Sequence, residues 1–135
     1  MKKFGSFVLS TLFFCWVGWA PAQADATKEG IVQVPVAQLY PKTQTTKPLI
    51  IDVRTKPEYE KAHIPNVRWI PLSDLEARLS ELRGNEKQPI YIVCASGRRS
   101  QRAAVLLKEK GFTQPMNVAG GTIAWIAAGY PVVKP

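Results

Sequence analysis

Cysteine and histidine are nearly absent from this sequence, which contains two cysteines and one histidine among its 135 residues. Structural zinc sites and iron–sulfur clusters need several such ligands at short, regular spacings, and the sequence contains no cluster of that kind. We therefore expect no metal site and no other bound cofactor.

A concentrated basic stripe is also missing, although the formal net charge is +8. The lysines and arginines are scattered and are not interleaved with aromatic residues, which argues against a nucleic-acid partner. The exception is a group of three arginines, Arg98, Arg99 and Arg102. Solubility explains the net charge about as well as binding of a small anion does, so charge alone leaves both open.

The longest apolar run lies at the N-terminus and has the features of an export signal. Lys2 and Lys3 precede the apolar segment Phe7–Ala20, and residues 22–24 form a small-residue cleavage site. We predict a signal peptide over residues 1–24, and a membrane contact only through this signal. A retained anchor is the alternative, because residues 4–24 carry no charge, but Pro21 and the cleavage site favour removal.

Removal of the signal leaves a single cysteine. Cys15 is lost with residues 1–24, and Cys94 remains. In an oxidising compartment a lone cysteine cannot form a disulfide within its own chain. Cys94 is therefore an inert core thiol, a partner in an intermolecular disulfide, or a reactive group.

The rest of the chain alternates short β-rich runs with runs of helical period, which is typical of an α/β domain. We predict a flexible tail over residues 25–30 and one domain over residues 31–135. The domain is expected to hold a central, mostly parallel five-stranded sheet flanked by helices. The expected strands are Ile31–Val34, Leu49–Val53, Val67–Ile70, Ile90–Val93 and Met116–Val118.

Helix signals lie between these strands. Ser73 and Glu76 have the spacing of a capping box, and Ser100 is placed to cap the next helix. Gly111 is expected to end that helix in a Schellman motif, with Phe112 packed back on Leu107. A last short helix is expected over residues 122–128.

Cys94 follows a central strand and precedes a helix, at the edge where α/β sheets bind ligands. Gly97 allows a left-handed backbone that turns successive N–H groups inward as an anion nest. The helix dipole and the neighbouring arginines also favour a thiolate. We expect a nucleophile in a solvent-facing loop here rather than a small core residue. The predicted surrounding residues are Ala95, Ser96, Gly97, Arg98, Arg99 and Ser100.

Three segments carry a resemblance to a known family. "IDVRTKPEYEKAHIPNV", "CASGRRSQRAAVLLKEKGF" and "VAGGTIAWIAAGYPV" resemble, in this order, the motifs of rhodanese domains, a family of sulfurtransferases. The likeness extends over residues 31–133. With the export signal, the chain also resembles the single-domain periplasmic thiosulfate sulfurtransferases of the phage-shock type, and this resemblance implies a periplasmic protein.

The resemblance implies roles for individual residues. Cys94 is the expected sulfur-accepting nucleophile, the loop from Cys94 to Arg99 is the expected catalytic cradle, and Arg99 closes it. Four residues separate Cys94 from Arg99. In this superfamily four intervening residues are associated with sulfur transfer, whereas five suit the related phosphatases, because the loop must close around one sulfur rather than a phosphoryl group.

Three further polar residues are given mainly structural roles. Asp52 and Arg54 end a strand beside the expected site and belong to its supporting residues. We expect Asp52 to accept hydrogen bonds from nearby backbone amides and Arg54 to pair with Glu58. His63 is expected in a structural turn, because thiolate attack needs no general base. The turn departs from the family pattern, with Ala62, Pro65 and Asn66 where glycines are usual, so ligand contacts are not inferred from it.

Together these features predict a sulfurtransferase working in two half-reactions. Thiosulfate, or another small sulfur donor, converts Cys94 to a persulfide, and cyanide or a thiol accepts the sulfur. The alternative is a non-catalytic rhodanese-like module that binds small anions or a protein. The short loop disfavours a third possibility, a phosphatase or arsenate reductase.

Overall fold

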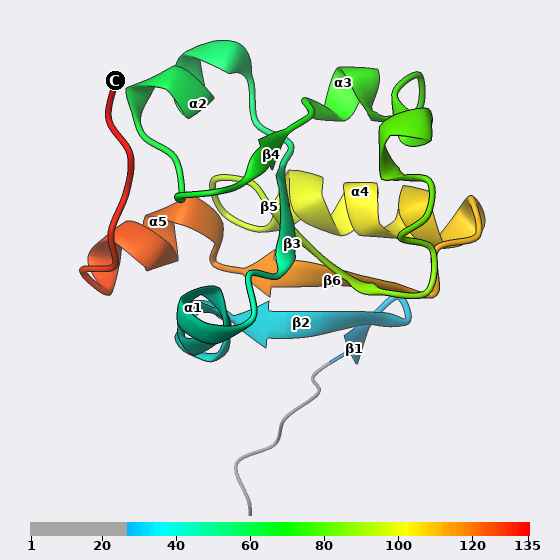
Figure 1. Cartoon of the computed structure of the whole chain (residues 1–135), viewed down its shortest axis with the longest axis horizontal. Coiled ribbons are helices and arrows are strands. Elements are labelled where there is room, and N and C mark those ends of the chain that lie inside the picture. Colours follow the sequence, from blue (N-terminus) through cyan, green and yellow to red (C-terminus); the bar gives the residue numbers. More distant parts are fainter. Residues whose placement is uncertain (1–26) are drawn as a thin grey trace, which may run out of the picture.

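Six strands form one sheet in the computed structural model, which describes residues 27–135 (Figure 1). Their order across the sheet is β1-β2-β6-β5-β3-β4, and every neighbouring pair is parallel except β1 with β2. The strands are Thr27–Lys28 (β1), Ile31–Pro35 (β2), Leu49–Asp52 (β3), Arg68–Trp69 (β4), Pro89–Val93 (β5) and Gln114–Ala119 (β6). The predicted signal peptide lies outside the described residues.

The α/β class and the mostly parallel sheet are confirmed, but the sheet has six strands rather than five. The added strand, β1, lies within the predicted flexible tail at residues 25–30. It pairs with β2 through a two-residue turn in which Glu29 and Gly30 have φ angles of 53° and 73°. Positive φ at both turn residues fits a type I′ hairpin, which favours antiparallel pairing.

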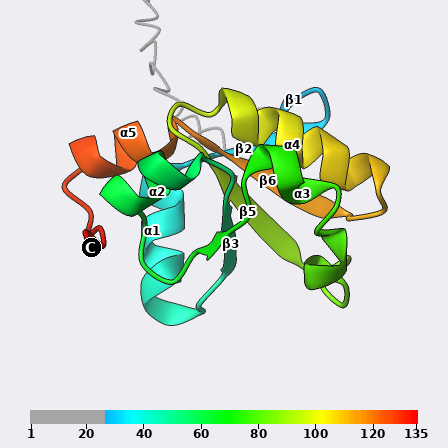
Figure 2. The ribbon, with the colours of Figure 1, turned by 90° about the horizontal axis from the view of Figure 1, so that it is seen from above.

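Within residues 27–135, five α-helices and one 3₁₀ helix surround the sheet. Figure 2 shows α3 and α4 beside one face and α1 and α5 beside the other. The α-helices are Val36–Thr45 (α1), Lys56–Lys61 (α2), Leu72–Leu75 (α3), Arg98–Glu109 (α4) and Gly121–Ala127 (α5), and the 3₁₀ helix is Leu79–Leu82 (η1).

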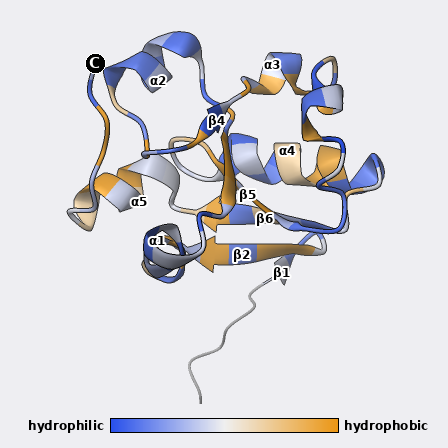
Figure 3. Ribbon diagram, in the orientation of Figure 1, coloured by the Kyte–Doolittle hydropathy of each residue, from blue (hydrophilic) through white to orange (hydrophobic). Residues whose placement is uncertain are grey.

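Both faces of the sheet are buried, as the unbroken apolar runs of β3 and β5 predict. Along β5, Ile90 and Ile92 pack toward α4, while Tyr91 and Val93 pack in the cluster that contains Trp125. In Figure 3, β3 is largely orange and β2 and β6 mix orange with blue, whereas α2 at the surface is largely blue. The central strands therefore form a rigid base for the loops at their carboxyl ends.

Two predicted helix caps are wrong and one is confirmed. Ser73 caps nothing, because α3 begins after Pro71 and the Ser73 hydroxyl bonds to Asp74. The capping box forms at α2 instead. Ser100 lies inside α4, whose N-cap is Gly97. The predicted Schellman ending of α4 is present, with the Phe112 N–H donating to the Leu107 carbonyl at 3.0 Å.

Candidate active site at the carboxyl edge of the sheet

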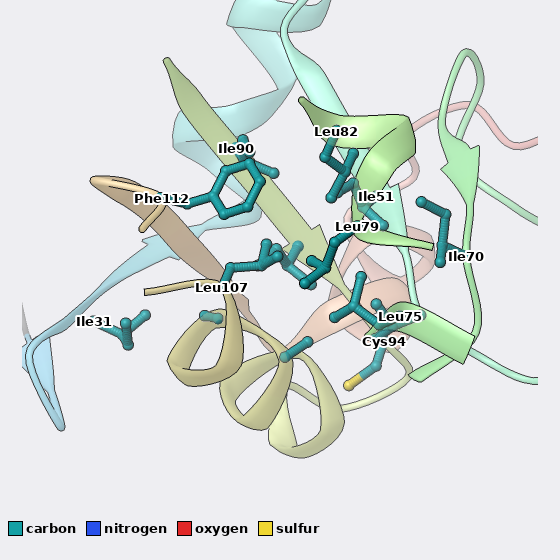
Figure 4. Close-up of a cluster of buried hydrophobic side chains, with 14 residues drawn as sticks. Ile31, Ile51, Ile70, Leu75, Leu79, Leu82, Ile90, Cys94, Leu107 and Phe112 are labelled. Carbon is teal, nitrogen blue, oxygen red and sulfur yellow. The ribbon is translucent and has the colours of Figure 1, made fainter. Parts of the chain in front are cut away.

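Cys94 directly follows β5, in the middle of the sheet, and its side chain is only 1% exposed. Figure 4 shows its sulfur beside α4 and close to Leu75, within the main apolar cluster. We expected a solvent-facing loop, and this expectation is wrong. Alternation along β5 places Cys94 on the same inward face as Ile90 and Ile92.

The loop after Cys94 closes around the sulfur. Gly97 has a φ of 100°, as predicted for a left-handed residue, and its N–H donates to Cys94 Sγ at 3.1 Å. Ser100 Oγ lies 3.3 Å from the same sulfur. Within this loop Ala95 is half-buried, whereas Ser96 and Arg98 are exposed. The predicted anion nest is therefore present, with a side chain of α4 added to it.

These donors favour the thiolate. Burial by itself raises the pKa of the Cys94 thiol, but hydrogen bonds from the Ser100 hydroxyl and from the N–H groups of Ser100, Gly97 and Ser96 outweigh burial. The pKa of Cys94 consequently lies below its ordinary value. The arrangement favours the thiolate without a general base.

Asn117 of β6 holds this cradle in place, and the sequence analysis missed it. Its side chain is 3% exposed; Nδ2 donates to the Gly97 carbonyl at 3.1 Å, and Oδ1 lies 2.5 Å from Ser100 Oγ. Nδ2 also donates to Gln33, whose amide reaches Gln101. Asn117 thus fixes both the left-handed Gly97 and the hydroxyl beside the sulfur.

Arg99, the predicted closing residue, makes a two-bond pair with Glu58 of α2. Its Nη1 and Nη2 atoms lie 2.8 and 2.7 Å from the two carboxylate oxygens. Hydrogen bonding from Arg99 lowers the pKa of Glu58 to about 2, with further bonds from Thr55, while burial opposes the shift. Hydrogen bonding to Glu58 raises the pKa of Arg99, and the nearby charge of Cys94 makes a smaller contribution in the same direction.

Asp52 and Arg54 pair with each other, so the predicted Arg54–Glu58 pair is wrong. Arg54 Nη2 lies 2.7 Å from Asp52 Oδ2 and 2.8 Å from the Ala62 carbonyl, in a nearly buried arrangement. Asp52 also accepts the Arg54 backbone N–H, as predicted. Because Arg54 pairs with Asp52, the Glu58 carboxylate remains available to pair with Arg99.

The start of α5 packs tightly against the cysteine loop. The N–H groups of Thr122 and Ile123 donate to the carbonyls of Cys94 and Ala95 at 2.8 and 3.1 Å. Gly121 has a φ of 56°, and a Cβ there would lie 2.3 Å from the Cys94 carbonyl oxygen. Gly121 is therefore required by close approach as well as by backbone conformation.

His63 has the structural surroundings predicted for it. Its backbone pairs with Val133, and its ring nitrogen Nδ1 lies 2.9 Å from the Tyr59 carbonyl. Other surface pockets, including one of about 610 Å³ lined in part by Lys47 and Arg68, lie at the amino ends of β3 and β5, at the opposite edge of the sheet. Between residues 27 and 135 no acidic, histidine and cysteine side chains cluster as metal ligands, and no helix is long and apolar enough to cross a membrane.

Replacing Ser100 with alanine is expected to raise the pKa of Cys94, because the hydroxyl that hydrogen-bonds to the thiolate is lost. The rate of alkylation by iodoacetamide, measured against pH, reports this pKa. Ser96→Ala is the matched control, because Ser96 acts through its backbone N–H, which alanine keeps. Equal profiles for the Ser100→Ala variant and the wild type would contradict the role given to the hydroxyl.

Known proteins share this architecture. The family model described as rhodanese-like domain matches residues 35–128. The Bacillus subtilis protein named "Putative sulfur carrier protein YrkF" is 53% identical over 76 residues, which is 56% of this chain but 40% of that protein. An Allochromatium vinosum protein named "Sulfurtransferase" is 36% identical over 64% of this chain and 79% of its own length.

A solved rhodanese-like domain protein from Staphylococcus aureus is similar in fold and in sequence. It superposes with a TM-score of 0.63 at 35% identity, covering 69% of this chain and 89% of that one. The sheet order, the position of Cys94 and these similarities agree with one another. The chain belongs to the rhodanese-like domain family.

Proposed function

We propose that this protein is a sulfurtransferase that carries sulfur as a persulfide on Cys94. The observation that carries the proposal is the buried thiol at the carboxyl edge of the sheet, which receives hydrogen bonds from Gly97 and Ser100 and has a lowered pKa. A structural cysteine in an apolar core needs no such donors. A nucleophile that must be ionised at neutral pH does need them.

In the first half-reaction, the Cys94 thiolate attacks the outer sulfur of thiosulfate. A new sulfur–sulfur bond forms at Cys94, the bond within thiosulfate breaks, and sulfite leaves with the electron pair of that bond. The product is a Cys94 persulfide anion, so charge is conserved. The inward-turned N–H groups of the cradle then face the negative sulfur.

In the second half-reaction, a thiophilic acceptor attacks the outer sulfur of the persulfide. With cyanide, thiocyanate forms and the Cys94 thiolate is regenerated; a thiol acceptor becomes a persulfide in the same way. The four-residue spacing between Cys94 and Arg99 supports sulfur over a phosphoryl group, since the cradle is small. Thiosulfate and cyanide are proposed as assay substrates.

Intact-mass measurement tests the proposal directly. Purified protein incubated with thiosulfate, and separately with methanethiosulfonate, is expected to gain the mass of one sulfur atom, and cyanide is expected to remove it. Absence of any gain with both donors would overturn the persulfide. Hydrolysis of an aryl phosphate that depends on Cys94 would instead point to a phosphatase.

A further inference from the structure

The arginine expected to close the cysteine loop is already paired with a carboxylate. Both terminal nitrogens of Arg99 bind the Glu58 carboxylate, in the fork geometry that gives the strongest arginine–carboxylate pairs. The residues come from α4 and α2, and 41 positions separate them in the sequence. Glu58 therefore places a carboxylate against the arginine that closes the cysteine loop, and this carboxylate offsets the positive charge of the arginine.

Glu58 is itself held from the other side. The Thr55 N–H and hydroxyl donate to Glu58 Oε2 at 3.0 and 2.7 Å, which completes the capping box of α2. A carboxylate fixed by both Thr55 and Arg99 does not swing away freely. Its pKa of about 2 keeps it charged throughout the physiological pH range.

Of the other arginines near the loop, Arg98 is exposed, whereas Arg54 offers no free charge. Arg54 is paired with Asp52, and both side chains are nearly buried. Arg54 and Glu58 line a surface pocket of about 190 Å³ together with Lys61, Ala62 and Ile126. Glu58 thus borders open space on the α2 side of its pair with Arg99.

We propose that Glu58 makes the site select sulfur donors by their charge. It favours monoanionic or uncharged donors, such as small persulfides and thiosulfonates, over the dianion thiosulfate. This inference rests on the proposed function. The repulsion between a fixed carboxylate and a donor scales with the charge of the donor. Glu58 therefore penalises a dianion about twice as much, in free energy, as a monoanion at the same place.

The test uses two donors with the same reacting sulfur and different charge. Thiosulfate is a dianion that releases sulfite, and methanethiosulfonate is a monoanion that releases methanesulfinate. Each transfers its outer sulfur to the Cys94 thiolate and leaves with the electron pair of the broken bond. The values of kcat/KM for both are measured in wild type and in Glu58→Gln, with cyanide as acceptor.

Glutamine is the appropriate replacement because its carbonyl oxygen, in the place of Oε2, can still accept from Thr55 and from Arg99 Nη1, while the charge and the acceptor for Arg99 Nη2 are lost. Removal of the charge is expected to raise kcat/KM about tenfold for thiosulfate and about threefold for methanethiosulfonate. The logarithms of these two fold-changes have a ratio of about two to one, because the charges of the two donors have that ratio. The difference between donors is expected to shrink at high ionic strength.

Glu60→Gln is the matched control. Glu60 lies on the same helix and has the same charge, but it is exposed, pairs with Lys56 and does not contact Arg99. It is expected to change kcat/KM by less than about twofold for either donor, because exposed pairs contribute little. A Glu60→Gln effect equal to that of Glu58→Gln would show that net charge, and not the Arg99 pair, is responsible.

Three outcomes overturn the proposal. Equal gains for both donors in Glu58→Gln, or losses for both, would mean that Glu58 only holds Arg99 in place. The ratio of the thiosulfate rate to the methanethiosulfonate rate is also measured for a free thiol. If this ratio is higher for the wild-type protein than for the free thiol, the proposal is overturned, even if the variant does not fold. If neither donor adds sulfur to wild-type Cys94, the proposed function fails, and intact mass shows this before any variant is compared.

Discussion

Replacement of Cys94 by serine is expected to lower thiocyanate formation from thiosulfate and cyanide by at least about a thousandfold, because an unactivated hydroxyl neither ionises near neutral pH nor forms a persulfide. The variant is also expected to show no gain of sulfur by intact mass. Serine is chosen because its oxygen can accept the Gly97 N–H and the Ser100 hydroxyl that now contact Sγ.

The burial of Cys94 makes the choice of replacement important. The side chain is 1% exposed and belongs to the main apolar cluster. Alanine would leave a small void and the Gly97 N–H without its acceptor, at a cost of about 1–3 kcal/mol. Thermal unfolding of both variants separates lost chemistry from lost stability. A folded serine variant that retains a substantial fraction of wild-type turnover would show that Cys94 is not the nucleophile.

The parts of the site that could be predicted are those set by neighbouring residues. A strand followed by Cys94, a glycine and a helix predicts the position of the thiol, and Gly97 predicts a left-handed turn. The Schellman ending at Gly111 and Phe112 is local in the same sense. Such features depend on the backbone preferences of a few neighbouring residues, and a single sequence is enough to predict these preferences.

The side-chain partners could not be predicted in this way. Glu58 lies 4 residues from Arg54 and 41 from Arg99, so spacing favours Arg54, yet tertiary packing joins Glu58 to Arg99. Asn117 reaches Gly97 and Ser100 from another strand, across 20 and 17 residues. Whether two side chains meet across a sheet depends on strand order, and the sequence shows only that strands are present.

One error was avoidable. The apolar run Ile90–Val93 already predicts a strand covered on both faces, so a cysteine directly after it is expected to be buried on either face. Ser100 was assigned to helix capping because serine is a common cap. With Gly97 at the cap, the Ser100 hydroxyl lies one turn into α4 and faces the sulfur.

Gly121→Ala is expected to be the most damaging single methyl group that can be added near the site. The new Cβ would lie 2.3 and 2.5 Å from the carbonyl oxygens of Cys94 and Ala95, and a backbone oxygen cannot move aside as a flexible side chain can. We expect a loss of about 4 kcal/mol in the free energy of unfolding, since the clash adds to the cost of a positive φ. Chemical denaturation measures this loss.

Gly129→Ala separates the two contributions. Gly129 also has a positive φ, 76°, but nothing lies within 4 Å of a Cβ placed there. It is expected to cost about 1 kcal/mol, the price of the left-handed conformation alone, with turnover unchanged. In Gly121→Ala the carbonyls that flank the nucleophile must shift, and a displacement of about 1 Å at a reacting group costs about a hundredfold in turnover. If the two variants lose equal stability and both keep full turnover, the close approach of α5 does not position the cysteine loop.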